Sequence, residues 1–337
     1  MTARKSIIPV FVPHLGCPND CVFCNQKRIS GQTEPATVET VKNAIVNAAA
    51  LTPPGTKRQL AFYGGSFTAI PEAEQTALLE AAMPFLKDGT VESIRLSTRP
   101  DAIDEEVLAR LKKYKVETVE LGAQSLCDRV LYLSGRGHTA EEVEDASRMV
   151  KAAGFRLILQ MMTGLPGDTD ESCVETARKI IALKPDGVRV YPTVIVKDTE
   201  LCDMWQAGEY SEHTVEDAVR VCAKITKLFD EAGIPIIRMG LNPTEELSGG
   251  AAIGGAYHPA LGELVRSRMM RDEAEKLLSG IEAESNIVLE VNSSEISKMT
   301  GQHRCNVEYL VKTFGLKSLK IRAGNVEKGK IIVTSLD

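Results

Sequence analysis

Apolar runs of strand length alternate with amphipathic helical patterns through the first 240 residues. The strand-like runs are residues 7–12, 59–63, 93–97, 118–122, 156–160, 187–191 and 235–239. The helical patterns between them are residues 38–51, 72–86, 104–113, 140–153, 171–183 and 214–232. Such alternation predicts parallel βα units. Six or seven units favour an α/β fold with an open or partial (β/α)6-type barrel, and a doubly wound sheet is the alternative.

The pattern changes after residue 240. Residues 241–257 contain Pro243 and four glycines, which predicts a linker or a loop that covers a site. Beyond it, residues 258–280 and 294–314 have helical patterns and 287–291 a strand pattern. Residues 319–322 and 331–334 are expected to form a final hairpin. We therefore predict a barrel domain over 1–240 and a small α/β domain over 258–337.

Charge and cysteine content narrow the class of protein. The 337 residues carry a net charge of −6, but residues 298–330 hold eight Lys/Arg against two Glu. This basic tail is either a solvated face or a surface for an anion such as a nucleic acid. Five of the eight cysteines are scattered, there is no leader-like start, and no apolar run of about 18 residues occurs. A cytoplasmic protein without membrane segments is expected.

Three cysteines gather in one loop after the first strand-like run. Cys17, Cys21 and Cys24 have the spacing C-x3-C-x2-C. A [4Fe–4S] cluster takes four ligands, usually thiolates, so three local cysteines would leave one iron open to a small molecule. The alternative is a structural zinc site closed by His14.

Paired glycines follow the second strand-like run. Gly64 and Gly65 precede Ser66, and glycines let a ligand approach bare backbone amides and carbonyls. By itself this stretch is better explained as an ordinary turn.

The cysteine spacing resembles the signature of the radical S-adenosylmethionine enzymes. The set of T-R-P-D at 98–101, E-L-G-A-Q-S at 120–125, R-G-H-T at 136–139, G-L-P-G at 164–167 and Y-P-T at 191–193 resembles the radical domain of the elongator catalytic subunit family. More distantly, the chain is similar to oxygen-independent coproporphyrinogen dehydrogenase. That elongator family spaces its first two cysteines further apart. No acetyltransferase domain is expected, because the sequence ends at Asp337.

The resemblance implies cofactors and a reaction. Cys17, Cys21 and Cys24 would bind a [4Fe–4S] cluster, and S-adenosylmethionine would chelate its open iron. An electron from a flavodoxin- or ferredoxin-type donor would cleave the sulfonium to a 5′-deoxyadenosyl radical, which abstracts hydrogen from a substrate. Cofactors of this kind carry the chemistry while the protein orients them.

The resemblance also assigns residues that contact S-adenosylmethionine. The Gly64, Gly65 and Ser66 stretch would hold its amino group, while Gln124 and Arg136 would face its carboxylate or ribose. Ser97 stands where relatives commonly have a Glu, and Gln160 stands where the porphyrinogen enzyme has an Asp. Candidate proton or radical relays are Tyr132, Tyr191, Cys127 and His138.

Three hypotheses for function follow. The first is a radical enzyme that acts on tRNA or another RNA, suggested by the family likeness and the basic tail. The second is a radical enzyme for a small anionic metabolite such as a porphyrinogen. The third is a non-catalytic, zinc-stapled RNA-binding protein.

Overall fold

The chain folds into two units. The computed structural model describes residues 6–12, 21–25, 29, 34 and 36–335. The first unit comprises Met1–Thr214 with Leu228–Tyr257, and the second comprises Val215–Lys227 with His258–Asp337. Helix α9 (Val215–Glu231) contributes residues to both.

The first unit is built on a curled sheet of seven parallel strands. Their order is β1-β2-β3-β4-β5-β6-β8, which follows the chain. The strands are β1 (Ser6–Phe11), β2 (Arg58–Tyr63), β3 (Ser93–Thr98), β4 (Val116–Gln124), β5 (Arg156–Thr163), β6 (Gly187–Pro192) and β8 (Ile236–Met239). A doubly wound sheet would reverse direction at a switch point, and this one does not. The predicted partial barrel is confirmed.

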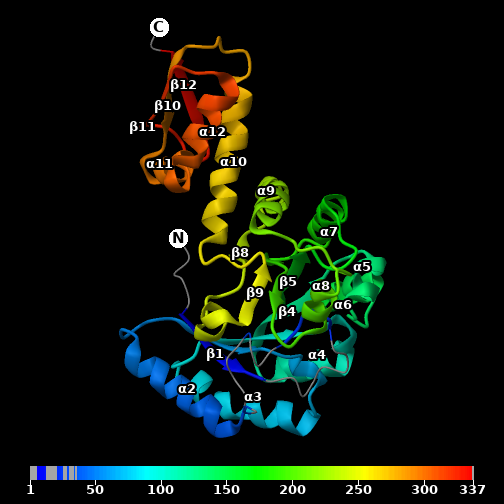
Figure 1. Ribbon diagram of the computed structural model, residues 1–337. Coiled ribbons are helices and arrows are strands. Elements are labelled where there is room, and N and C mark those ends of the chain that lie inside the picture. Colours follow the sequence, from blue (N-terminus) through cyan, green and yellow to red (C-terminus); the bar gives the residue numbers. More distant parts are fainter. Residues whose placement is uncertain (1–5, 13–20, 26–28, 30–33, 35, 336–337) are drawn as a thin grey trace. The chain divides into compact units, whose positions relative to one another are not determined.

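Helices cover the outer face of this sheet (Figure 1). They are α2 (Val38–Leu51), α3 (Glu72–Lys87), α4 (Glu105–Lys113), α6 (Ala140–Ala152) and α7 (Asp170–Ala182). Capping boxes fix where several of them begin: the Thr139 hydroxyl accepts from the Glu142 amide, and the Glu142 carboxylate accepts from the Thr139 amide. The predicted strands and helices of this unit agree with these bounds to within three residues.

Several strands alternate between an apolar face and a polar one. On β3, Ile94 and Leu96 are fully buried, whereas Arg95 is half-buried. On β6, Val190 is fully buried and Arg189 is half-buried. The apolar positions pack under the helices, so the polar positions line the concave side of the barrel.

Short elements between the strands were not predicted from the sequence. They are α5 (Asp128–Leu133), β7 (Val194–Val196) and α8 (Glu200–Gln206). The glycine-rich stretch contains β9 (Ala252–Gly255), which pairs antiparallel with β7. Gly255 has φ +79°, and a Cβ there would lie 2.6 Å from the Thr193 carbonyl oxygen, so this crossing requires glycine.

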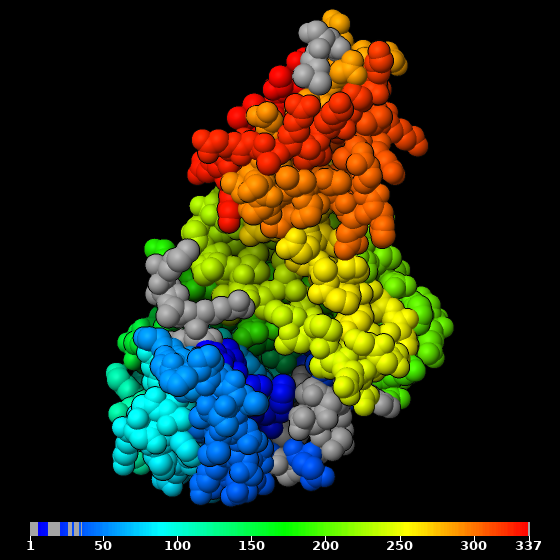
Figure 2. Space-filling model, turned by 90° about the vertical axis from the view of Figure 1, so that its left-hand side faces the viewer, coloured from blue at the N-terminus to red at the C-terminus, as the bar shows by residue number. Residues whose placement is uncertain are grey.

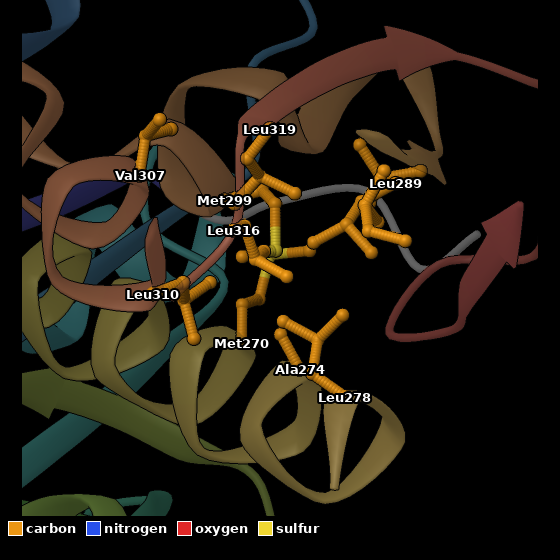
Figure 3. Close-up of a cluster of buried hydrophobic side chains, with 11 residues drawn as sticks. Met270, Ala274, Leu278, Leu289, Met299, Val307, Leu310, Leu316 and Leu319 are labelled. Carbon is orange, nitrogen blue, oxygen red and sulfur yellow. The ribbon is translucent and has the colours of Figure 1, made fainter. Parts of the chain in front are cut away.

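The second unit has its own sheet and core. It contains α10 (Leu261–Leu278), β10 (Asn286–Val291), α11 (Ile296–Thr300), α12 (Cys305–Phe314), β11 (Ser318–Ala323) and β12 (Ile331–Ser335). Figure 3 shows the side chains that fill its interior, among them Met270 and Leu278 of α10, Leu289 of β10 and Leu310 of α12.

Two expectations for this unit were wrong. β11 and β12 do not form a hairpin, because both pair with β10: β11 runs parallel to it and β12 antiparallel. The single helix expected over 294–314 is broken after Thr300, where Gly301 has φ +77° and Arg304 has φ +66°. The break lets the chain cross from β10 to a parallel neighbour.

No helix in the described part of the chain combines the length and the apolarity needed to cross a lipid bilayer.

Candidate active site

The cysteine loop begins beside the carboxyl end of β1. Cys17 and His14 lie outside the described residues, but Cys21 and Cys24 share a tight turn in which the Cys24 amide donates to the Cys21 carbonyl over 2.9 Å. Val22, between them, donates to the Ser134 carbonyl (3.1 Å) and accepts from the Leu201 amide (2.8 Å). Segments that follow two other strands therefore hold this part of the loop in place.

Arg136 connects the cysteine loop to the end of β4. Its Nη1 donates to Cys21 Sγ at 3.4 Å, and its Nη2 donates to the Gly122 carbonyl at 2.7 Å. Its Nε is buried and has no hydrogen-bond acceptor among the described residues. The backbone carbonyl of Arg136 in turn accepts from Arg99 Nη2 at 2.7 Å. A guanidinium beside the sulfur suits an anionic sulfur ligand, and its unpaired N–H suits an anionic molecule next to it.

The absence of a side chain at Gly122 leaves space for Arg136 and Gln124, the two residues that the sequence analysis assigned to S-adenosylmethionine. A Cβ at this position would lie 2.8 Å from Arg136 Nη2 and 2.9 Å from Gln124 Nε2. Gln124 itself has φ +63°, an uncommon conformation for a residue other than glycine. A register shift between β4 and β5 at this point accompanies that geometry. The structure therefore brings Gln124 and Arg136 together at the carboxyl end of β4.

The glycine stretch lies at the carboxyl end of β2. Gly64 has φ +95°, and a Cβ there would lie 3.3 Å from the Val12 carbonyl oxygen. The Ser66 side chain is buried: its hydroxyl is 2.9 Å from Thr98 Oγ1 and accepts from the Arg99 amide at 3.1 Å. That hydroxyl ties the loop after β2 to the loop after β3. Its contact with S-adenosylmethionine stays a prediction.

A buried carboxylate organises the interior of the barrel below these loops. Glu120 of β4 is fully buried and bonds Arg95 of β3 at 2.8 Å and Arg189 of β6 at 2.8 Å. Tyr63 of β2 receives a hydrogen bond from Arg189 Nη2 at 2.9 Å, and Tyr191 receives one from Nη1 at 3.2 Å. Burial opposes the charge of Arg189 and is the largest single influence, but the Glu120 carboxylate, Tyr191 and Tyr63 together outweigh it and raise the pKa of Arg189. This network spans four strands.

Sequence reasoning missed this network. The one available signal was charged residues at alternate positions within otherwise apolar strands, which is unusual for strands covered by helices. Ser97 and Gln160, which the sequence did single out, lie at its edge. Gln160 Nε2 is 3.4 Å from Ser97 Oγ and 3.4 Å from Glu120 Oε2.

The candidate relay residues differ in exposure. Tyr132 is 84% exposed, whereas His138 is buried and its Nε2 lies 3.3 Å from the Ala123 carbonyl oxygen. Burial, followed by the charge of Arg136, lowers the pKa of His138 from 6.5 to about 4. His138 is therefore neutral at pH 7, with the proton on Nε2 facing the carbonyl.

This lowered pKa predicts a loss of stability in mild acid. In the unfolded chain His138 binds a proton below pH 6.5, whereas in the folded chain it binds one only below about pH 4. The free energy of unfolding therefore falls as the pH falls through this range. We expect the contribution to reach about 1.4 kcal/mol at pH ~5.5. Urea unfolding at pH ~7.5 and ~5.5 measures it. In His138→Gln, this part of the difference in unfolding free energy between the two pH values should disappear. If the difference were unchanged, His138 would not be its source.

Comparison with known proteins places the fold and the site in one family. Residues 11–180 match the Radical SAM superfamily, and residues 185–271 match the Radical_SAM C-terminal domain. The chain belongs to the radical S-adenosylmethionine superfamily, and it is an enzyme of that class. The cysteine loop and the strand-end loops described above lie within the matched region.

The relatives it resembles are those that the motifs suggested. It is 33% identical over 129 residues to the tRNA uridine(34) acetyltransferase of Methanocaldococcus jannaschii, covering 37% of this chain and 24% of that protein. It is 28% identical over 185 residues to human Elongator complex protein 3, covering 49% and 34%. The chain thus spans about a third or less of these relatives. The likeness to the radical domain of the elongator catalytic subunit is confirmed.

Solved structures agree on the fold. An N-terminally deleted Methanocaldococcus infernus Elp3 superposes with a TM-score of 0.63 at 22% identity, covering 80% of this chain and 64% of that one. Methylornithine synthase superposes with a TM-score of 0.52 at 17% identity, covering 77% and 73%. Both show the same partial barrel.

Members of this superfamily use a [4Fe–4S] cluster and S-adenosylmethionine. The described residues fit that pair, because Cys21 and Cys24 supply sulfur donors in one turn and Arg136 offers an unpaired buried N–H beside them. When bound, the cluster and S-adenosylmethionine supply one-electron cleavage to a 5′-deoxyadenosyl radical. Because the chain belongs to a superfamily of cluster-containing enzymes, we set aside the hypothesis of a non-catalytic, zinc-stapled RNA-binding protein.

Proposed function

We propose that this enzyme uses its radical chemistry on tRNA or another RNA. The observation that carries the proposal is the match to two relatives of which one is named for its action on tRNA uridine(34). A flavodoxin- or ferredoxin-type protein would supply the electron. Cys17 would join Cys21 and Cys24 as the third sulfur ligand.

Arg136 and Gln124 are the residues we assign to S-adenosylmethionine at the end of β4. The Nε of Arg136, which has no acceptor among the residues that the structure describes, would donate to the carboxylate of the methionine moiety. This charge-assisted bond would also satisfy a buried donor. Gln124 would reach the same carboxylate or the ribose. Backbone groups of Gly64 and Gly65 would hold the amino group at the end of β2, with the Ser66 hydroxyl near them.

Ser97 and Gln160 are assigned to the ribose side of the same molecule. Ser97 lies on β3 and Gln160 on β5, with β4 between them. The Gln160 amide oxygen can accept from a ribose hydroxyl while its nitrogen stays near Ser97 and Glu120. The Glu120 network below them fills the barrel with paired charges.

The test is 5′-deoxyadenosine formation by anaerobically reconstituted protein. With a reductant, S-adenosylmethionine and total tRNA, we expect product to form and the rate to rise when tRNA is added. If an intact cluster gives no 5′-deoxyadenosine, the enzymatic proposal fails. If product forms but tRNA leaves its rate unchanged, the RNA substrate is wrong.

The second candidate substrate is a small anionic metabolite such as a porphyrinogen. The observation in its favour is the pair of guanidinium groups, Arg95 and Arg189, inside the barrel. Glu120 already neutralises part of that charge, which is why we rank this candidate second. Stimulation of 5′-deoxyadenosine formation by a porphyrinogen and not by tRNA would reverse the order.

Gly122→Ala tests the assignment of Arg136 and Gln124. The new methyl group would stand within 3.0 Å of both side chains, so both must move. We expect S-adenosylmethionine to bind at least tenfold more weakly, measured by equilibrium dialysis on the reconstituted protein. The cluster, followed by its visible absorption, should remain. Gly249→Ala is the control, because Gly249 has open space around it and no positive φ. Equal weakening in both variants would contradict the assignment.

A further inference from the structure

The second unit has a groove that the radical chemistry does not use. It has a volume of about 400 Å³ and lies between α11, α12 and β11. Its apolar members include Ile296, Val307 and Ile321, which are buried or half-buried. Its charged members are Arg304, Lys320 and Arg322, which are exposed. We call it the basic groove.

Topology creates this groove. β11 is an edge strand, hydrogen-bonded only to β10 among the described strands, so its other edge presents unpaired backbone N–H and C=O groups. The helices α11 and α12 cross from β10 to β11 and leave their junction beside that open edge. The result is an apolar channel flanked by backbone polar groups.

The junction between the two helices is rigidly built. Gly301 has φ +77°, and a Cβ there would lie 2.6 Å from Cys305 Sγ. The buried Asn306 amide donates to the carbonyls of Ser267, Lys298 and Met299 at 3.1–3.2 Å. These bonds hold the end of α11 and the start of α12 against α10. A rigid turn loses little entropy when it binds a ligand.

The turn itself has the form of a nucleic-acid clamp. Gln302 and His303 are exposed between Gly301 and Arg304, and Arg304 has φ +66°. A Gly-x-x-Gly turn between two helices is what KH modules use to clamp the backbone of about four nucleotides. Here Arg304 takes the left-handed conformation that glycine favours while adding a cation.

Charge points to a polyanion as the occupant. Arg304, Lys320 and Arg322 have no carboxylate partner in the part of the chain that the structure describes. Between residues 296 and 323 there are six Lys/Arg and one acidic residue, Glu308, in a chain whose net charge is −6. Glu290 of β10 stands opposite Arg322 in the strand register, with no ion pair between the two side chains. Cations beside an apolar channel match phosphates beside bases.

We propose that the basic groove binds single-stranded RNA. The phosphates would lie along residues 302–304 and the two β11 cations, and unstacked bases would enter the apolar channel, where the free edge of β11 can hydrogen-bond them. A duplex keeps its bases stacked and could not enter. The choice of RNA over other polyanions rests on the function proposed above, whereas the groove itself does not.

The test measures binding by the whole 337-residue chain in the absence of S-adenosylmethionine. The probe is a fluorescein-labelled single-stranded RNA of random sequence, about 12 nucleotides long, which exceeds the roughly four that such a turn clamps. Lys320→Gln/Arg322→Gln removes two cations from the groove. Lys312→Gln/Lys317→Gln removes two exposed cations of the same unit that do not line it. Circular dichroism checks that both variants are folded.

We expect the groove variant to bind at least tenfold more weakly and the control less than threefold. In the groove variant, the slope of log affinity against log salt should fall by about 1.4, since each phosphate contact in a single strand contributes about 0.7. Equal losses in the two variants, or no binding by the unaltered protein, would overturn the proposal. So would binding of the RNA duplex, or of single-stranded DNA, as tight as that of single-stranded RNA.

A second measurement separates this inference from the proposed substrate. If the groove binds RNA but RNA does not stimulate 5′-deoxyadenosine formation, the substrate proposal fails and the groove stands. If RNA stimulates the reaction, and the groove variant matches the unaltered protein both in KM and in RNA affinity, the groove is not the recognition site and this inference fails.

Discussion

Cys21→Ala should remove the iron–sulfur cluster and with it all measurable 5′-deoxyadenosine formation. Only three cysteines are available in the loop, so losing one leaves an iron without a protein ligand. The fold should survive: Cys21 is a small buried side chain, and losing it costs about 1 kcal/mol. Iron and sulfide analysis of anaerobically purified protein, with a product assay, measures the first effect. Circular dichroism measures the second.

Cys222→Ala is the matched control. Cys222 is also fully buried, but it lies on α9 outside the cysteine loop. This variant should keep its iron, its sulfide and its activity. A Cys21→Ala protein that retained the cluster would show that the loop is not the cluster site, and zinc without iron in the unaltered protein would restore the zinc scaffold.

Glu120→Gln should cause a large loss of stability. The substitution keeps the shape of the side chain but leaves Arg95 and Arg189 without the carboxylate that both contact at 2.8 Å. Removing one partner of a buried ion pair costs about 3–5 kcal/mol. The guanidinium groups are 14% and 15% exposed, so we expect the lower end, about 3 kcal/mol, by urea denaturation.

Glu92→Gln is the control for this prediction. Glu92 also forms an ion pair at 2.8 Å, with Lys57, but both side chains are largely in contact with water. Solvent screens that pair, so its loss should change stability far less. Equal effects of the two substitutions would mean that burial does not strengthen the Glu120 network.

Features that depend on residues close together in the chain were predicted from the sequence, and features that depend on distant residues were not. Helix starts such as Thr139 with Glu142, and turns such as Gly64, depend on residues a few positions apart, so patterns along the chain located them. The pairing of β11 with β10 depends on residues about thirty positions apart. Two short strand patterns separated by a turn predict a hairpin, and only packing against α10 to α12 shows that they flank β10 instead.

The site shows the same division. The motifs predicted which loops would meet, because the carboxyl ends of parallel strands lie at one edge of a sheet. They did not predict that Arg136 would contact both Cys21 and Gly122, or that the Ser66 hydroxyl would face Thr98. Those contacts depend on side-chain directions that strand register and loop packing set.

By itself the sequence determined the order of strands and helices, the cysteine loop and the family to which its motifs point. These are encoded locally, in the period of apolar residues and in fixed spacings. Only the tertiary structure decided that Glu120 neutralises Arg95 and Arg189, and that a groove lined by Arg304, Lys320 and Arg322 opens beside β11. Both features bring together residues from separate elements. The pattern of apolar residues along the chain does not show which residues will meet across a sheet or a crossover.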